Sequence, residues 1–254
     1  MIQLIIAHNT FREATRDRVL AGVLVCGLVM MLATQLMTPL AMGESFRLTM
    51  DLGLTTISML GMLVILMVGT NLVGKELEKR TIYNLLSRPI PRWAYLVGKW
   101  AGLSAALWAV AALLGLALFA IMAAGGLGAH PVAVAQSVYL AGLELTVMTA
   151  IAVLFSAFST PVLSALYTMA LYAVGQWSYD LRAFAENFPP ALGGTLQAIA
   201  NLVPNLPVFN MRTLAAEGMP TGVEHLGVAT LYALVYVAGV LALATAVFES
   251  RDFK

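Results

Sequence analysis

The chain has 254 residues, of which 60% are hydrophobic and only 11% carry a charge. Soluble domains carry about 25% charged residues, so this composition excludes an ordinary soluble globule and indicates a membrane protein. The formal net charge of +1 argues against the strongly basic surface that binds nucleic acid. The single cysteine, Cys26, excludes an intramolecular disulfide and is expected to pack as a small apolar group.

Residues 1–18 predict an amphipathic helix that lies flat on the membrane surface. Its apolar positions recur at helical spacing: Leu4, Ala7, Phe11 and Ala14. Its charged positions fall on the other side: Arg12, Glu13, Arg16 and Asp17. A helix with one apolar and one charged face is typical of a segment at the membrane interface.

Six apolar stretches follow, each close to the roughly 20 residues that a helix needs to cross the hydrocarbon core. They are Val19 to Met37, Leu52 to Val73, Trp100 to Ala124, Val134 to Phe155, Val162 to Tyr179 and Leu226 to Phe248. Backbone amides in lipid must be hydrogen-bonded within their segment, and no stretch alternates with the period of a barrel strand. The sequence therefore predicts an all-α, polytopic membrane protein with six transmembrane helices in a single domain over residues 1–254.

The basic residues predict how these helices are oriented. One side of the membrane would hold the N-terminus, residues 74–99, residues 156–161 and the C-terminal tail. Eleven Lys and Arg residues then fall on that side, and only Arg47, Arg182 and Arg212 fall on the other. Short loops rich in basic residues stay in the cytoplasm, so both termini are expected there.

Two connecting segments are predicted to have structure of their own. Residues 74–92 begin as a charged helical turn and are stopped by Pro89 and Pro91, so they are expected to form a rigid cytoplasmic hairpin. The external loop, residues 180–224, contains an uncharged helical pattern over residues 191–203 that is too short to cross the membrane. This pattern favours either a plain interfacial helix or a lid over an exit path.

A search for nucleotide and metal sites finds no complete pattern. Residues 69–75 resemble a phosphate-binding loop, but Glu76 stands where that loop needs Ser or Thr, and the segment ends a membrane helix. The histidines fall on three different segments outside the predicted spans: His8, His130 and His225. The sequence therefore predicts neither a nucleotide site nor a metal site on this chain.

Glu144 is the one charged residue within the six stretches, near the middle of the fourth. An acid at the centre of a membrane helix costs roughly 2.5 to 3.5 kcal/mol on insertion scales, so its surroundings must offset that cost. The spans offer no cation as its partner. Glu144 is therefore either a structural group, hydrogen-bonded to Ser, Thr or Tyr of other helices, or part of a substrate or proton path.

Two predicted cytoplasmic segments carry a more specific pattern. The first is the charged run from Arg12 to Arg18 ahead of an apolar span, and the second is ELEKRTIYNLLSRPIPRWAYLVGK, from Glu76 to Lys99. Together they resemble the ABC-2 family of ABC transporter permeases, with a closer likeness to the subgroup of the nitrous-oxide-reductase maturation permease. The matching positions are Glu76 or Glu78, Thr81, Leu85, Leu86, Pro89, Arg92, Tyr95, Gly98 and Lys99. Arg80 replaces the commoner Gly before the Thr.

The resemblance implies a permease of the bacterial inner membrane that pairs with a second permease, expected to be a copy of itself. Two soluble ABC ATPase subunits would hold ATP and Mg²⁺, so this chain would carry no cofactor and would not itself be an enzyme. The residues expected to couple to the ATPase are Arg12, Glu13, Arg16, Glu76, Glu78, Lys79, Arg80, Thr81, Pro89 and Arg92. Charges of both signs on a rigid hairpin independently favour docking of a soluble partner. The alternatives are a passive channel and an intramembrane enzyme or assembly factor, and no substrate is indicated.

Overall fold

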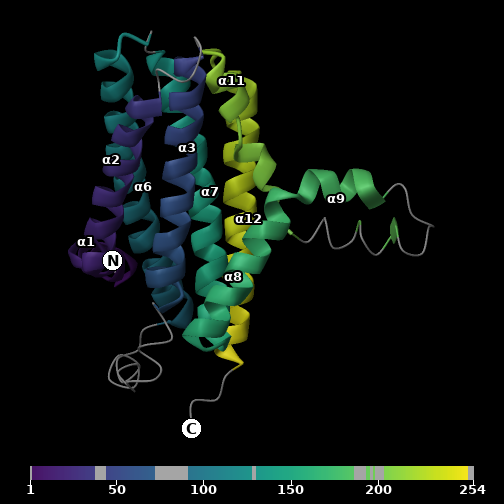
Figure 1. Ribbon diagram of the computed structural model, residues 1–254. Coiled ribbons are helices and arrows are strands. Elements are labelled where there is room, and N and C mark those ends of the chain that lie inside the picture. The colour runs from purple at the N-terminus through teal and green to yellow at the C-terminus, as the bar shows by residue number, and fades with distance from the viewer. Residues whose placement is uncertain are drawn as a thin grey trace.

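The computed structural model describes residues 2–37, 44–71, 91–127, 130–185, 193–194, 197 and 203–250. In this part of the chain every regular element is a helix, as predicted (Figure 1). The α-helices are α1 (Ile2–Arg16), α2 (Arg18–Met37), α3 (Ser45–Val64), α6 (Arg92–Ala124), α7 (Pro131–Phe158), α8 (Pro161–Gln176), α9 (Ser178–Ala185), α11 (Arg212–Ala216) and α12 (Val223–Glu249). A π-helical turn, η2 (Ile65–Gly69), extends α3, and a 3₁₀ turn, η3 (Leu206–Phe209), precedes α11.

Five helices are long and apolar enough to cross a membrane, and they form a bundle (Figure 1). They are α2, α3 with its π-helical extension, α6, α7 and α12, and they correspond to five of the six predicted spans. The helix α7 lies at the centre, where it packs against α3, α6, α8 and α12. Its inward residues Val147, Met148 and Ala150 are fully buried, which explains why this helix is hydrophobic on all sides.

The predicted fifth span differs from the helix that forms there. The helix α8 has 16 residues, about 24 Å at 1.5 Å per residue, so it is shorter than a hydrocarbon core of about 30 Å. It begins beside the end of α7 and stops at Gln176, after which α9 points away from the bundle (Figure 1). Residues 203–209 pack closely beside this end of α8, since a Cβ atom on Gly175 would lie 2.9 Å from Leu206 Cδ1. Composition alone does not reveal this stop.

Residues 203–216 pack into the bundle, although they belong to the predicted external loop. Leu206 and Phe209 in η3 are 0% and 3% exposed, and Ala215 in α11 is 1% exposed. The helix α11 packs against α3 and α7. The backbone N–H of Asn205 donates a hydrogen bond of 2.7 Å to the Tyr232 hydroxyl of α12. The interfacial helix predicted over residues 191–203 lies almost entirely outside the described residues.

The N-terminal helix α1 lies against the first half of α6. Gly98 and Gly102 allow this close approach, since a Cβ atom on Gly102 would lie 2.4 Å from the backbone oxygen of Ala7. Thr10 and Ala14 are buried on the same side of α1, whereas Leu4 is exposed. The apolar face predicted for residues 1–18 is therefore used in part to bind α6.

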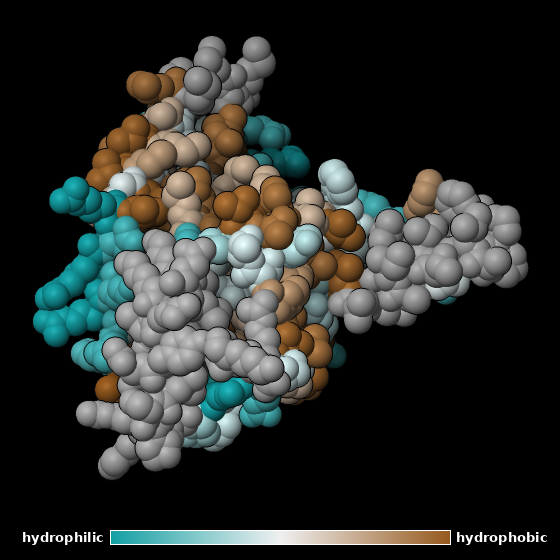
Figure 2. All heavy atoms as spheres, turned by 90° about the horizontal axis from the view of Figure 1, so that it is seen from below, coloured by the Kyte–Doolittle hydropathy of each residue, from teal (hydrophilic) through white to brown (hydrophobic). Residues whose placement is uncertain are grey.

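The chain segments at one end of the bundle are those that the basic residues group together. The helix α1, the end of α3, the start of α6 and the end of α12 all lie there (Figure 1). Figure 2 looks at this end and shows hydrophilic side chains gathered on the side where α1 lies, next to exposed hydrophobic ones. The helix α1 and the end of α12 therefore lie at the same end of the bundle.

Candidate functional site

Glu144 is buried at the centre of the bundle, 3% exposed, midway along α7. Two side chains from other helices donate hydrogen bonds to its carboxylate. Ser58 Oγ of α3 lies 3.3 Å from Oε2, and Gln176 Nε2 at the end of α8 lies 2.6 Å from Oε1. Each carboxylate oxygen therefore has a donor, which offsets part of the cost of burying it.

The prediction that a hydroxyl group of another helix bonds to Glu144 is confirmed by Ser58. The hydrogen bond from the Gln176 amide was not predicted. Gln176 falls near the end of an apolar stretch, where an uncharged amide gives no signal in composition or periodicity. Its role depends on α8 ending beside the middle of α7. The partner therefore follows from the tertiary packing of α8 against α7, which brings Gln176 Nε2 to the carboxylate.

A small cavity of about 10 Å³ lies next to the carboxylate. Its lining comprises Leu54, Ser58, Ser137, Ala141, Glu144, Phe209, Met211 and Arg212. Ser137 Oγ is buried and has no hydrogen-bond partner among the described residues. A polar space of this size is close to the minimum that holds one water molecule, and such a water would satisfy the Ser137 hydroxyl.

The structure also brings a cation to Glu144, which the sequence did not predict. Arg212 begins α11 and lines the same small cavity as Glu144. Its guanidinium donates a hydrogen bond of 3.2 Å to Thr55 Oγ1 of α3. The basic-residue rule placed Arg212 in an external loop, and only the packing of residues 203–216 into the bundle draws it toward Glu144.

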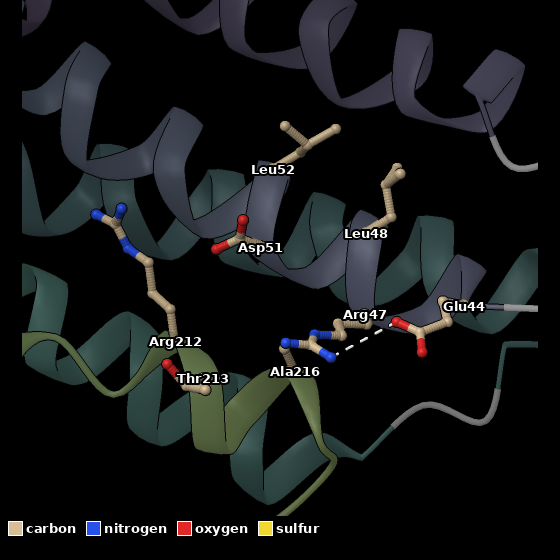
Figure 3. A pocket seen from close by; sticks show the side chains of 8 residues that line it. All are labelled: Glu44, Arg47, Leu48, Asp51, Leu52, Arg212, Thr213 and Ala216. Atoms are coloured by element: carbon tan, nitrogen blue, oxygen red, sulfur yellow. Dashed lines mark ion pairs between the residues drawn. The ribbon is translucent and has the colours of Figure 1, made fainter. Parts of the chain in front are cut away.

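A larger pocket of about 510 Å³ lies between the start of α3 and α11 (Figure 3), at the end of the bundle away from α1 (Figure 1). Its residues come from the start of α3 and from α11: Glu44, Arg47, Leu48, Asp51, Leu52, Arg212, Thr213 and Ala216. Arg47 Nη1 and Glu44 Oε2 form an exposed ion pair at 3.6 Å. Arg212 is thus shared by an outer pocket and by the interior cavity that contains Glu144.

The predicted coupling residues of α1 lie on its surface beside α6. Arg12, Glu13 and Arg16 are exposed. Glu13 Oε2 lies 3.8 Å from Lys99 Nζ, and Lys99 is 6% exposed because α1 covers it. The Lys99 ammonium also lies 5.9 Å from the centre of the Tyr95 ring. Lys99 therefore joins α1 to α6 and is not itself a free contact for a soluble protein.

Arg92 begins α6 and binds the end of α12. Its Nη1 donates hydrogen bonds to the carbonyl oxygens of Phe248 at 3.0 Å and Glu249 at 3.2 Å. Its guanidinium carbon lies 6.0 Å from the centre of the Phe248 ring. The last carbonyls of a helix have no partner within the helix and carry partial negative charge, so an arginine there stabilises the helix end.

The remaining predicted coupling residues lie outside the described part of the chain. These are Glu76, Glu78, Lys79, Arg80, Thr81 and Pro89. The structure describes the two elements that flank these residues in sequence, which are the end of η2 and the start of α6. At the first of these, Ser156 Oγ of α7 donates a hydrogen bond of 2.9 Å to the carbonyl oxygen of Thr70. Thr70, which precedes residues 74–92, is therefore bonded to α7, and Arg92, at their end, is bonded to α12.

The described residues contain no group of three His, Cys, Asp or Glu side chains placed to hold a metal ion. Two of the histidines serve local packing. His225 Nε2 lies 2.9 Å from the carbonyl oxygen of Val208, and the His130 ring packs edge-on against Phe46 with centroids 5.4 Å apart.

Comparison with known families gives a match over nearly the whole chain. A family model with the description ABC-2 family transporter protein matches residues 4–253. No curated protein sequence matches this chain. The family match therefore extends the likeness from the two cytoplasmic segments to all of the helices described above.

Proposed function

Because this chain belongs to the ABC-2 family of transporter proteins, we propose that it is the membrane-spanning permease subunit of an ATP-driven transporter. A separate cytoplasmic ATPase would bind ATP and Mg²⁺, and its hydrolysis cycle would drive movement of a substrate across the membrane. The observation that carries this proposal is the family match over residues 4–253, on a chain whose five long helices fit a multi-pass membrane protein.

The proposed docking site for the ATPase combines residues 74–92 with the exposed face of α1. Three observations support it. Thr70, shortly before the charged segment, is bonded to α7, and Arg92, at its end, is bonded to α12. The exposed charges of Arg12 and Arg16 lie on the same end of the molecule. Charges of both signs on this segment favour specific association with a soluble partner.

The finer features of the assembly are part of the same proposal. The transporter would contain two ATPase subunits and two copies of this permease in the bacterial inner membrane, with both termini in the cytoplasm. The chain would make six crossings. In the fifth, α8 would fill the cytoplasmic half of the bundle and residues 203–216 the outer half. The likeness of residues 76–99 to the nitrous-oxide-reductase maturation permease remains a subgroup hypothesis.

The experiment that tests the function is isolation of the native complex. The chain would be tagged, extracted from its own membranes in mild detergent, and its soluble partner identified by mass spectrometry. We expect a protein with a complete phosphate-binding loop, whose ATPase rate changes when it is bound to the permease in lipid. A passive channel would instead conduct in reconstituted vesicles without any ATPase, and that result would contradict the proposal.

A further inference from the structure

Two opposite charges in the outer pocket have no ion-pair partner among the residues that the structure describes. The guanidinium of Arg212 comes from α11 and the carboxylate of Asp51 from α3, and Figure 3 shows them on different walls of one opening. In the described part of the chain, no ion pair within 4.0 Å involves either residue. A ligand with both an anionic and a cationic group would neutralise both.

The pocket lies at the start of a membrane helix that is longer than the hydrocarbon core. The membrane helix formed by α3 and η2 has 25 residues, about 37 Å, whereas the hydrocarbon core is about 30 Å thick. The excess of about 7 Å leaves roughly one turn or more outside the hydrocarbon. Glu44 directly precedes α3, Arg47 lies in its first turn, and Asp51 lies about 9 Å from the start of the helix. Leu48 and Leu52 give the same pocket an apolar side, as a ligand with attached hydrocarbon requires.

Arg212 connects this pocket to the buried acid. The outer pocket and the small interior cavity share Arg212 in their linings, and the interior cavity also contains Glu144 and the unpartnered Ser137 hydroxyl. Glu144 and an anion in the outer pocket would therefore compete for the field of one guanidinium. Because the outer pocket and Glu144 share the Arg212 guanidinium, ligand binding in the pocket is coupled to the charge of Glu144. This coupling must be reciprocal.

We propose that the outer pocket binds a zwitterionic ligand of the phosphate–amine class, with its phosphate on Arg212 and its ammonium on Asp51, and that its occupancy is coupled to Glu144 through Arg212. The ligand can be the headgroup of a membrane lipid or a free small molecule. This inference does not depend on docking of an ATPase, because all of its residues lie at the opposite end or in the centre of the bundle.

Binding would be measured on the full-length protein in lipid-free detergent by isothermal titration calorimetry. The probes are free phosphoethanolamine, short-chain dihexanoyl phosphatidylethanolamine, and dihexanoyl phosphatidylglycerol, which lacks the amine. We expect the phosphatidylethanolamine to bind with a Kd at least about tenfold lower than the phosphatidylglycerol, as loss of a charge-assisted contact predicts. Comparable binding of free phosphoethanolamine would identify a soluble ligand, and binding of the lipid alone would identify a headgroup. Equal affinity for both lipids, or no binding, would overturn the proposal.

Variants test the named contacts. Arg212→Gln and Asp51→Asn should each raise the Kd roughly tenfold, whereas the exposed Glu217→Gln on the same end of the molecule should leave it unchanged. Asp51 is exposed, so its variant reports on binding even if Arg212→Gln is poorly folded. An unchanged Kd in Asp51→Asn would contradict the assignment.

The coupling between Glu144 and the outer pocket is tested by Glu144→Gln, with and without Arg212. Glu144→Gln removes the competing negative charge, so Arg212 should attract the phosphate more strongly and the Kd should fall by about fivefold. In the Arg212→Gln background the same change should have no effect. A purely structural Glu144 would leave the Kd unchanged in both backgrounds, and that result would refute the coupling.

Discussion

Gln176 donates a hydrogen bond of 2.6 Å to Glu144, and this bond joins the end of the short helix α8 to the middle of the central helix α7. The contact lies at the depth where α8 stops and residues 203–216 take over the space beside α7. Membrane proteins often place functional groups where helices are interrupted near the centre of the bilayer. The Glu144 cluster has that position, with donors from α3 and α8, and Arg212 of α11 lines the adjacent small cavity.

The surroundings of Glu144 predict different outcomes for two substitutions. Glu144→Gln keeps the shape, and its amide can bond to both Gln176 and the Ser58 hydroxyl, so we expect assembly and transport close to wild type. Glu144→Leu leaves two donors unsatisfied and should lower stability by about 0.6 kcal/mol per lost bond, up to about 1.7. Thermal unfolding in detergent and transport by the assembled complex would be compared. A well-assembled Gln variant without transport would show that the carboxylate itself works in translocation.

The packing of α1 against α6 depends on Gly102. A side chain there would enter the space of the Ala7 carbonyl and the Thr10 side chain, so Gly102→Val should destabilise the protein by about 1 to 3 kcal/mol and release α1. Gly239→Val in α12 is the matched control, because no heavy atom outside its own helix lies within 4 Å of a Cβ there. The melting temperature and proteolysis of residues 1–18 measure the effect. Equal stability of the two variants would contradict this packing.

Arg92 should hold the last turn of α12. In Arg92→Ala the carbonyls of Phe248 and Glu249 lose their donor, at a cost of about 0.3 to 1 kcal/mol. We expect faster hydrogen–deuterium exchange at residues 246–250, with the middle of α12 unaffected. Arg92→Lys keeps the charge but not the geometry, and should give an intermediate rate. An unchanged exchange rate at the end of α12 in the Ala variant would show that this contact contributes little.

The predicted orientation can be tested with single cysteines in a Cys26→Ala background. A cysteine at Ser87 should be shielded from a membrane-impermeant thiol reagent added to intact cells, whereas one at Glu217 should react. Glu217 is exposed, and it is a better position than its neighbour Gly218, whose φ of 72° would strain any side chain. Labelling at position 87 together with protection at position 217 would show that the chain has the opposite orientation in the membrane.

The sequence alone predicts the parts of this fold that depend on local patterns. Five spans follow from length and composition, whereas the close approach of α1 at Gly98 and Gly102 is known only from the packing. The shared site around Glu144 needs tertiary information. A helix that stops halfway has the same composition as one that crosses, so neither Gln176 nor Arg212 can be assigned to Glu144 before the packing of α8 and α11 is known.

The most direct measurement of the central claim is ATPase coupling in a docking variant. Glu76→Lys combined with Glu78→Lys reverses two charges in the proposed docking segment, and Glu217→Lys combined with Glu224→Lys reverses two exposed charges at the other end of the bundle. Each permease would be reconstituted in lipid with the ATPase isolated from the native complex. The account predicts that the first variant inserts normally but loses co-purification and ATPase coupling, while the control keeps both. Unchanged binding and coupling in the first variant would contradict it.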